Sequence, residues 1–122
     1  MSEIVTPQQV ERRLLDLGSQ MYEAQKMLVE AEANDAAAQC AWRVNSAKAR
    51  MEIRAKAATE GRKMTVTEID DEALLMCEKE VTAQITCESL LRAARSNVSR
   101  VKTQVDIARS IGTSVRVSMD LA

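Results

Sequence analysis

The placement of proline and glycine constrains this chain more than any other feature of its sequence. Its 122 residues include one proline, Pro7, and three glycines, at positions 18, 61 and 112. These two residue types mark most turns and helix ends, so long stretches without them leave few places for loops. The sequence therefore predicts a first helix over about 7–60, a turn over 61–66, a second helix over about 67–111 and a tail over 112–122.

Composition favours thin helical packing over a globular core. The chain has no phenylalanine, one tyrosine and one tryptophan, although 46% of its residues are hydrophobic. Many of these are alanines, which form helices well and fill cores poorly. We therefore expect an all-α fold, an antiparallel coiled-coil-like hairpin of two long helices in a single domain over residues 1–122. Because such a hairpin has no enclosed interior, we expect the chain to form a homo-oligomer.

Local signals mark where the helices begin and end. Thr6 fits an N-cap, and Gln9 completes its capping box. Gly61 fits the position just past a helix end. The second helix has two competing capping pairs, Thr65 with Glu68 and Thr67 with Asp70. We expect the glycine at position 112 to end that helix, and the one at position 18 to kink the first helix or to separate a short N-terminal piece. The period-two pattern of the tail predicts either a short edge strand or a frayed terminus.

Apolar residues at alternating steps of three and four predict the packing seams. The first helix carries one seam at Val10, Leu14, Leu17, Met21, Ala24, Leu28 and Ala31. After a phase shift across an alanine-rich stretch, the seam resumes at Cys40, Val44, Ala47, Met51, Ala55 and Ala58. The second helix carries Cys87, Leu91, Ala94, Val98, Val101, Val105 and Ala108. The predicted oligomer interface comprises Leu14, Leu17, Met21, Leu28, Leu91, Val98, Val101 and Val105, because a lone hairpin is not expected to bury them all.

Charge alternates in four blocks along the chain. Residues 1–35 hold three basic and seven acidic side chains (net −4), and residues 43–63 hold seven and two (net +5). Residues 64–88 hold one and seven (net −6), and residues 89–118 hold six and one (net +5). Folding the chain back near residue 64 places opposite charges beside each other at both levels. The blocks therefore favour an antiparallel hairpin over a parallel or staggered one.

Several classes of function find no support in the sequence. The chain has no histidine, so Ser/His and Cys/His nucleophile pairs are excluded. The glycines are too far apart for a phosphate-binding loop, and the cysteines lack pairing or zinc-site spacing. No leader-like segment or apolar run of membrane-spanning length is present. We expect a non-enzyme without metal or cofactor, with reduced cysteines, in the cytoplasm.

The basic residues are the one group with functional promise. Lys48, Arg50 and Arg54 lie on the first predicted helix, and Arg62 and Lys63 lie in the turn that follows. Rows of lysine and arginine suit phosphates, and an aromatic such as Trp42 can stack on an exposed base. The alternative is that these charges pair with the acidic blocks, and that the tryptophan is a seam residue. The five basic residues are the predicted nucleic-acid site.

A family resemblance adds to this interpretation. Over roughly residues 20–112, the chain resembles the UvsY-like recombination mediators of tailed bacteriophages, and also small helical proteins of phage early regions. The resemblance is carried by Tyr22-Glu23-Ala24, by Ala47 to Glu52, by Gly61-Arg62, and by Ala93-Ala94-Arg95 through Arg109-Ser110-Ile111. It implies a helical hairpin that assembles into rings and binds single-stranded DNA. Lys48 and Arg50 match the family's DNA-contacting Lys-x-Arg pair, whereas the aromatic residues that follow this pair are missing.

Two functions of different classes follow from these observations. The first is an oligomeric single-stranded DNA-binding mediator of phage recombination or replication, whose implied partners are single-stranded DNA, a RecA-like recombinase and a single-strand-binding protein in the host cytoplasm. The alternative is a protein-interaction module, such as a coiled-coil scaffold or a phage inhibitor of a host protein. Excess positive surface would favour the first function. Exposed apolar patches with balanced charge would favour the second.

Overall fold

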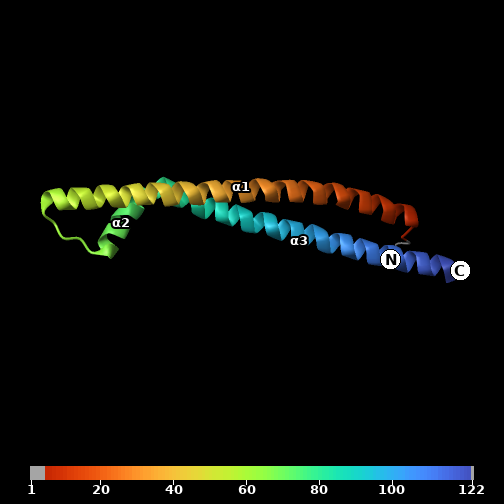
Figure 1. Cartoon of the computed structure of the whole chain (residues 1–122). Coiled ribbons are helices and arrows are strands. Elements are labelled where there is room, and N and C mark those ends of the chain that lie inside the picture. Colours follow the sequence, from red (N-terminus) through yellow and green to blue (C-terminus); the bar gives the residue numbers. More distant parts are fainter. Residues whose placement is uncertain (1–4, 122) are drawn as a thin grey trace. The chain divides into compact units, whose positions relative to one another are not determined.

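A computed structural model describes residues 5–121, and all of their regular structure is α-helical. Helix α1 spans Pro7–Glu60, α2 spans Val66–Met76 and α3 spans Glu78–Leu121 (Figure 1). The all-α prediction is therefore confirmed for this part of the chain, which contains no strand. Residues 1–4 and 122, which the sequence analysis placed at the ends of the domain, lie outside the described residues.

The helices pack into two compact units. Of the described chain, unit 1 comprises residues 5–30 and 92–121, which are the first part of α1 and the last part of α3. Unit 2 comprises residues 31–91, which are the rest of α1, all of α2 and the start of α3. Within unit 2, α2 lies beside the C-terminal end of α1 and is joined to it by residues 61–65 (Figure 1).

The core of unit 1 forms where the two predicted seams meet. Leu17 is fully buried and Val101 is 1% exposed, and Val10, Ala24 and Ala108 are also buried. The beginning of α1 packs near the end of α3, and later α1 residues pack near earlier α3 residues, so the two segments are antiparallel. Large aliphatic residues recur every three or four positions on otherwise polar helices, and burying that stripe stabilises the pair.

The core of unit 2 lies on a different face of α1 from the predicted one. Its buried cluster comprises Ala49, Ile53, Ile69, Ala73 and Cys77, with Trp42 and Met64 packed against it. The predicted seam from Cys40 to Ala58 is exposed instead, so that prediction is wrong. The partly buried position of Trp42 agrees with its interpretation as a seam residue.

Polar contacts in unit 2 confirm that oppositely charged blocks meet there. The Arg50 Nε atom donates to Asp70 Oδ1 at 3.0 Å, and Asn45 Nδ2 donates to Glu80 Oε1 at 3.1 Å. The earlier α1 residue meets the later partner, so α1 is antiparallel to the chain that packs on it. The Arg50–Asp70 pair is partly exposed, and such pairs typically contribute about 0–1 kcal/mol.

The predicted helix ends at three positions are confirmed atom by atom. Thr6 and Gln9 form a reciprocal capping box, with N–H to side-chain distances of 3.0 and 3.3 Å. Thr65 caps α2 by accepting from the Glu68 N–H at 3.2 Å, so the competing Thr67 start is wrong. Gly61 has a φ of 70°, which places it in the left-handed region that favours glycine. The N–H groups of residues 61 and 62 donate to the carbonyls of residues 58 and 57, which closes α1 as a Schellman motif.

The predicted second helix is interrupted at Cys77. This residue ends α2 with a φ of −107° and a ψ of 30°, and α3 starts at the next position. No proline or glycine lies nearby, and the i→i+4 hydrogen bonds on both sides of Cys77 are about 3.0 Å long. The break therefore has no local sequence signal, in contrast to most helix kinks. Its position coincides with burial of the Cys77 side chain in the core of unit 2.

The glycines at positions 18 and 112 lie inside helices. Helix α1 continues through Gly18, so no separate N-terminal piece exists. Helix α3 passes Gly112 and runs to Leu121, so the strand and the frayed end predicted for the tail are wrong over residues 112–121. A Cβ atom at Gly112 would lie 3.0 Å from Cγ1 of Val10, whereas one at Gly18 would meet nothing within 4 Å. Gly112 therefore permits close packing in unit 1 and does not end the helix.

Alanine substitutions at these two glycines are expected to differ in their effect on stability. Gly18→Ala should raise the free energy of unfolding by about 0.5–1 kcal/mol, because alanine is the better helix former and the added methyl group meets open space. Gly112→Ala should gain less or lose stability, because its methyl group crowds the stiff Val10 side chain. Urea unfolding of both variants measures the difference, and equal gains would contradict the close packing at Gly112.

Candidate interaction surface

The exposed side of α1 in unit 2 carries a continuous row of apolar and small side chains. We call this row the outer α1 face, and it comprises Cys40, Val44, Ala47, Met51, Ala55 and Ala58. Val44 is 46% exposed and Met51 is 68% exposed. Successive residues turn by about 100° in an α-helix, so this row lies opposite the buried positions 46, 49, 53 and 57. The outer α1 face has the spacing of a packing seam, and its residues stay exposed among the described residues 5–121.

Basic side chains flank the outer α1 face. Arg43 and Arg54 project along one edge, and Lys48 lies on the other. All three are exposed, and none takes part in an ion pair among the described residues. Glu52 is the acidic residue beside the same edge as Lys48. The surface is therefore apolar along its middle, positively charged along the edge with Arg43 and Arg54, and mixed in charge along the edge with Lys48 and Glu52.

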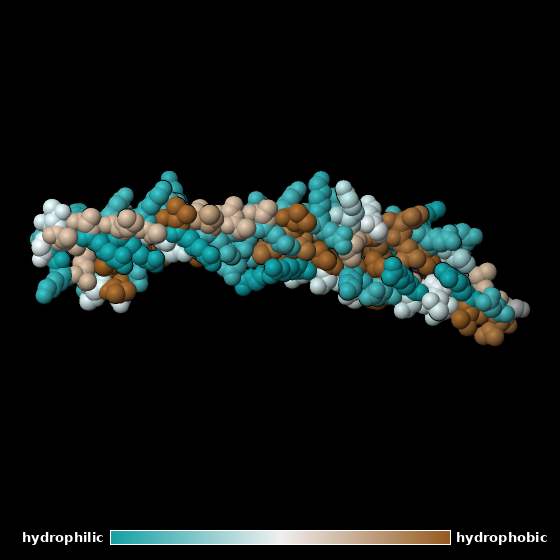
Figure 2. Space-filling view, in the orientation of Figure 1, coloured by the Kyte–Doolittle hydropathy of each residue, from teal (hydrophilic) through white to brown (hydrophobic). Residues whose placement is uncertain are grey.

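Helix α2 carries a patch of the opposite charge. Its sequence contains four acidic residues and no lysine or arginine. All four are exposed. Asp70 forms an ion pair with Arg50, whereas Glu68, Asp71 and Glu72 take part in no ion pair among the described residues. Leu74 and Leu75 are exposed beside them, at 46% and 75%. We call these five exposed residues the α2 patch, and Figure 2 shows apolar side chains both along α1 in unit 2 and over α2.

Sequence reasoning missed both surfaces as sites. The residues of the outer α1 face were assigned to the core, because alanine occupies both sides of this part of the helix. The acidic start of α2 counts in the sequence only as part of the acidic block over residues 64–88. A signal was present at Leu74 and Leu75, since two adjacent leucines point about 100° apart and Ile69 and Ala73 already supply the buried side.

The predicted nucleic-acid residues all lie in unit 2 but do not form one row. Arg50 is hydrogen-bonded to Asp70, and Arg62 pairs with Glu60 at 3.0 Å. Lys48, Arg54 and Lys63 are exposed and have no ion pair among the described residues. Two of the five cations thus have carboxylate partners, but only Arg50 pairs with an acidic block, because Glu60 belongs to the same basic block as Arg62.

The helix separates the two members of the Lys-x-Arg pair. Residues two positions apart differ by about 200° around an α-helix, so Lys48 and Arg50 point to nearly opposite sides of α1. Arg50 points toward α2, and Lys48 points to solvent. The two side chains cannot grip the same phosphate on one straight helix.

The predicted oligomer interface is at least partly buried by the chain itself. Leu17, Leu91 and Val101 are buried, whereas Leu14, Met21, Leu28, Val98 and Val105 are partly buried. The chain alone thus buries three of the eight residues and leaves five partly exposed. Homo-oligomerisation stays a prediction, without the three buried side chains as its surface. Four of the others line a groove of about 730 Å³ in unit 1 with Gly18 at its edge.

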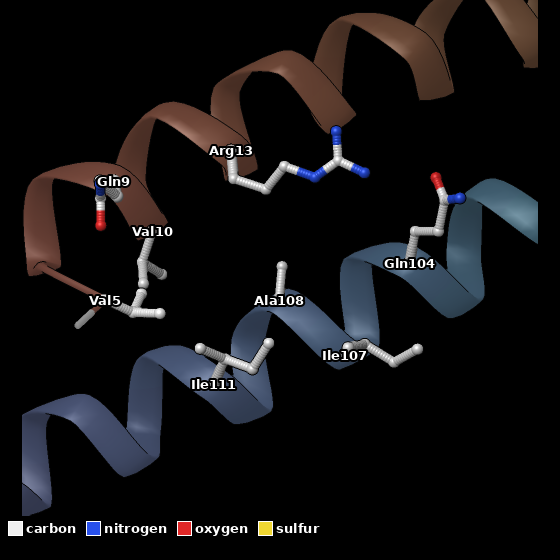
Figure 3. Close-up of a pocket in the computed structure, with 8 residues that line it drawn as sticks. All are labelled: Val5, Gln9, Val10, Arg13, Gln104, Ile107, Ala108 and Ile111. Atoms are coloured by element: carbon white, nitrogen blue, oxygen red, sulfur yellow. The ribbon is translucent and has the colours of Figure 1, made fainter. Parts of the chain in front are cut away.

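A smaller pocket opens where α1 begins in unit 1 (Figure 3). Its volume is about 390 Å³, within the range of small-molecule sites. Aliphatic side chains make up most of its wall, and the Arg13 guanidinium lies on the α1 side facing Gln104 of α3 (Figure 3). The lining residues are Val5, Gln9, Val10, Arg13, Gln104, Ile107, Ala108 and Ile111. Neither a buried polar group nor a charge cluster at this pocket selects a ligand.

The three cysteines occupy three different environments. Cys40 is exposed on the outer α1 face, Cys87 is partly buried and Cys77 is buried, and none forms a disulfide. Burial is the main cause that raises the pKa of the Cys77 thiol, and the nearby Glu80 carboxylate adds to the effect. The Cys77 thiol is therefore protonated at neutral pH, which makes it a weak nucleophile and a weak metal ligand.

The raised pKa of Cys77 predicts how stability depends on pH. The folded state holds this proton more tightly than the unfolded chain. The stability that the bound proton contributes is therefore fully present below the ordinary thiol pKa of 9.0, and it is lost as the pH rises above 9.0 through the raised pKa of the folded state. The slope cannot exceed about 1.4 kcal/mol per pH unit, the limit for one proton. Urea unfolding between pH 8 and 10 should show a steeper loss for the wild type than for Cys77→Ala. Cys87→Ala is the matched control, and a Cys77→Ala variant with the wild-type slope would contradict the assignment.

No helix within residues 5–121 combines the length and apolarity of a membrane span. Over the same residues, no three His, Cys, Asp or Glu side chains gather as metal ligands.

Comparison with protein-family models, with curated proteins and with solved structures finds no match to the chain.

Proposed function

We propose that this chain is a non-enzymatic protein-interaction module that docks another helix on the outer α1 face. The observation that carries the proposal is the exposure of a row at helical seam spacing, from Cys40 to Ala58, opposite the buried side of α1. Exposed apolar patches bordered by charge mark interaction sites on soluble proteins. The basic margins from Arg43 and Arg54 would orient an acidic or amphipathic partner helix.

Cys40 is a native probe for this docking, because it is exposed on the outer α1 face. In the cells that naturally produce the chain, N-ethylmaleimide should label Cys40 several-fold more slowly than in dilute purified protein. Mass spectrometry of the labelled peptides measures both rates. A cysteine introduced by Ser89→Cys, at an exposed position of α3 in the same unit, is the matched control. Cellular thiols consume part of the reagent and slow both sites alike, so the Cys40 rate is taken relative to this control in each setting. An equal relative rate for Cys40 in both settings would refute the docking function.

We propose single-stranded DNA binding as a second function, supported by the exposed cations of unit 2. Arg54, Lys48 and Lys63 lack ion-pair partners among the described residues and are available for phosphates. The RecA-like recombinase and the single-strand-binding protein are the partners that the UvsY-like resemblance implies for this function. Arg50 would contribute only after leaving Asp70.

A salt titration tests the second function. Affinity for a long oligonucleotide should fall steeply as salt rises, with a logarithmic slope of about −0.7 for each phosphate contacted. Lys48→Ala with Arg54→Ala should weaken binding and reduce the magnitude of this slope by about 1.4 if each contacts one phosphate. Arg12→Ala with Arg116→Ala removes two exposed cations of unit 1 and serves as the control. Absence of binding by the wild type at low salt would refute this function.

A further inference from the structure

Building on the docking function proposed above, we propose that the partner of the outer α1 face is the α2 patch of a second copy of this chain. Both surfaces lie within unit 2, and both expose large apolar side chains. Helix α2 has 11 residues and is about 16 Å long at 1.5 Å per residue. The outer α1 face is about 27 Å long by the same measure, so a single α2 fits along it.

Charge selects this pairing over the two symmetric alternatives. Pairing two outer α1 faces antiparallel would bring Arg43 and Arg54 of one copy toward the same two residues of the other, whereas Lys48 and Glu52 on the other edge offset each other. Pairing two α2 patches would oppose Glu68, Asp71 and Glu72 in the same way, with no basic residue in α2 to relieve them. Only the outer α1 face against an α2 patch places arginines opposite carboxylates, and like charges across an interface are strongly unfavourable.

The two surfaces point away from each other. Helix α2 packs on α1 through Ile69 and Ala73, which face Ala49 and Ile53. The outer α1 face therefore points away from α2, and the α2 patch points away from α1. When two copies join in this way, one copy keeps a free α2 patch and the other keeps a free outer α1 face. The contact is therefore head-to-tail, and further copies can add at both ends.

Charge exchange provides the test. An α1 variant, Arg43→Glu with Arg54→Glu, and an α2 variant, Asp71→Lys with Glu72→Lys, would each oppose like charges when alone. All four side chains are exposed and lie outside the ion pairs, so both variants should keep the helicity of the wild type by circular dichroism. When the two variants are mixed in equal amounts, the acidic outer α1 face of the first can bind the basic α2 patch of the second. The unchanged outer α1 face of the second variant can also bind the unchanged α2 patch of the first.

Light scattering at low salt over a concentration series should show the wild type rising above the 13.5 kDa of one chain and past twice that mass. The protein concentration at which half of the chains have assembled should rise about tenfold or more for each variant alone. In the mixture it should return toward the wild-type value. The control Arg12→Glu with Arg116→Glu, which changes the charge of unit 1 by the same amount as the α1 variant, should assemble like the wild type.

Three results would overturn self-docking: a wild type that stays monomeric at about 100 µM, a mass that stops at two copies, or a mixture that fails to recover. If the purified wild type is monomeric while Cys40 is protected in cells, another protein occupies the outer α1 face, and the docking function stands without self-assembly. If Cys40 is unprotected in cells and the protein is monomeric, both proposals fail.

Discussion

Leu17→Asp is expected to destroy the packing of unit 1. Leu17 is fully buried in the seam of unit 1, which also buries Val101 of α3 to 1% exposure. A carboxylate placed there has no cationic partner among the described ion pairs, and burying an unpaired charge costs several kcal/mol. Whole domains are stable by only about 5–15 kcal/mol, so a loss of this size removes a large part of the total. Thermal unfolding followed by circular dichroism should show reduced helicity at 25 °C and a much lower midpoint.

Leu15→Asp is the matched control for this prediction. Leu15 lies two residues earlier on the same helix and is 76% exposed. The same chemical change there adds a solvated charge and should alter the free energy of unfolding by no more than about 0.5 kcal/mol. Equal loss of helicity in both variants would show that the seam does not lie where unit 1 places it.

Ile53→Ala is expected to destabilise unit 2 by about 2–4 kcal/mol. Ile53 is 6% exposed and is the large aliphatic side chain that α1 contributes to the cluster with Ile69, Ala73 and Cys77. Its truncation leaves a cavity among small side chains, and such substitutions typically cost 2–5 kcal/mol. The open, thin packing of a helix pair allows some collapse, which favours the lower part of this range. Guanidinium unfolding measures the change.

Met51→Ala distinguishes the observed seam from the one that periodicity favoured. Met51 is 68% exposed and points about 200° away from Ile53 around α1. At concentrations where the protein is monomeric, its truncation should change stability by less than about 0.5 kcal/mol. A larger effect for Met51→Ala than for Ile53→Ala would reverse the assignment of the buried face.

Short-range interactions explain which parts of the fold the sequence determined. The capping box of Thr6 and Gln9, the N-cap Thr65 and the Schellman end at Gly61 form between residues at most five positions apart. Such contacts depend on residue identity and spacing alone, so they could be predicted together with the all-α class. The seam of unit 1 was also predictable, because Val10, Leu17, Val101 and Ala108 stand out among polar neighbours.

The candidate site was predictable only in part. The sequence identified the cations of unit 2 as candidates. In the fold, however, Arg50 forms an ion pair with Asp70, and Arg62 forms one with Glu60. The helix placed Lys48 nearly opposite Arg50, which the linear Lys-x-Arg spacing concealed. The outer α1 face could not be predicted, because the exposure of its residues depends on which side of α1 the other helices cover.

Tertiary packing decided the remaining features, because the sequence offered near-equal alternatives there. Alanine lies on both sides of α1 beyond residue 31, so periodicity could not choose between the face of Ala49 and that of Ala47. The packing of Ile69, Ala73 and Cys77 on Ile53 made that choice, and the helix break at Cys77 occurs where that packing ends. In unit 1, Gly112 looked like a helix terminator, and only the approach of Val10 shows that it serves close packing inside α3. Local chemistry thus determined the helices and most of their ends, and the burial of large side chains against small ones decided which faces meet and which stay exposed.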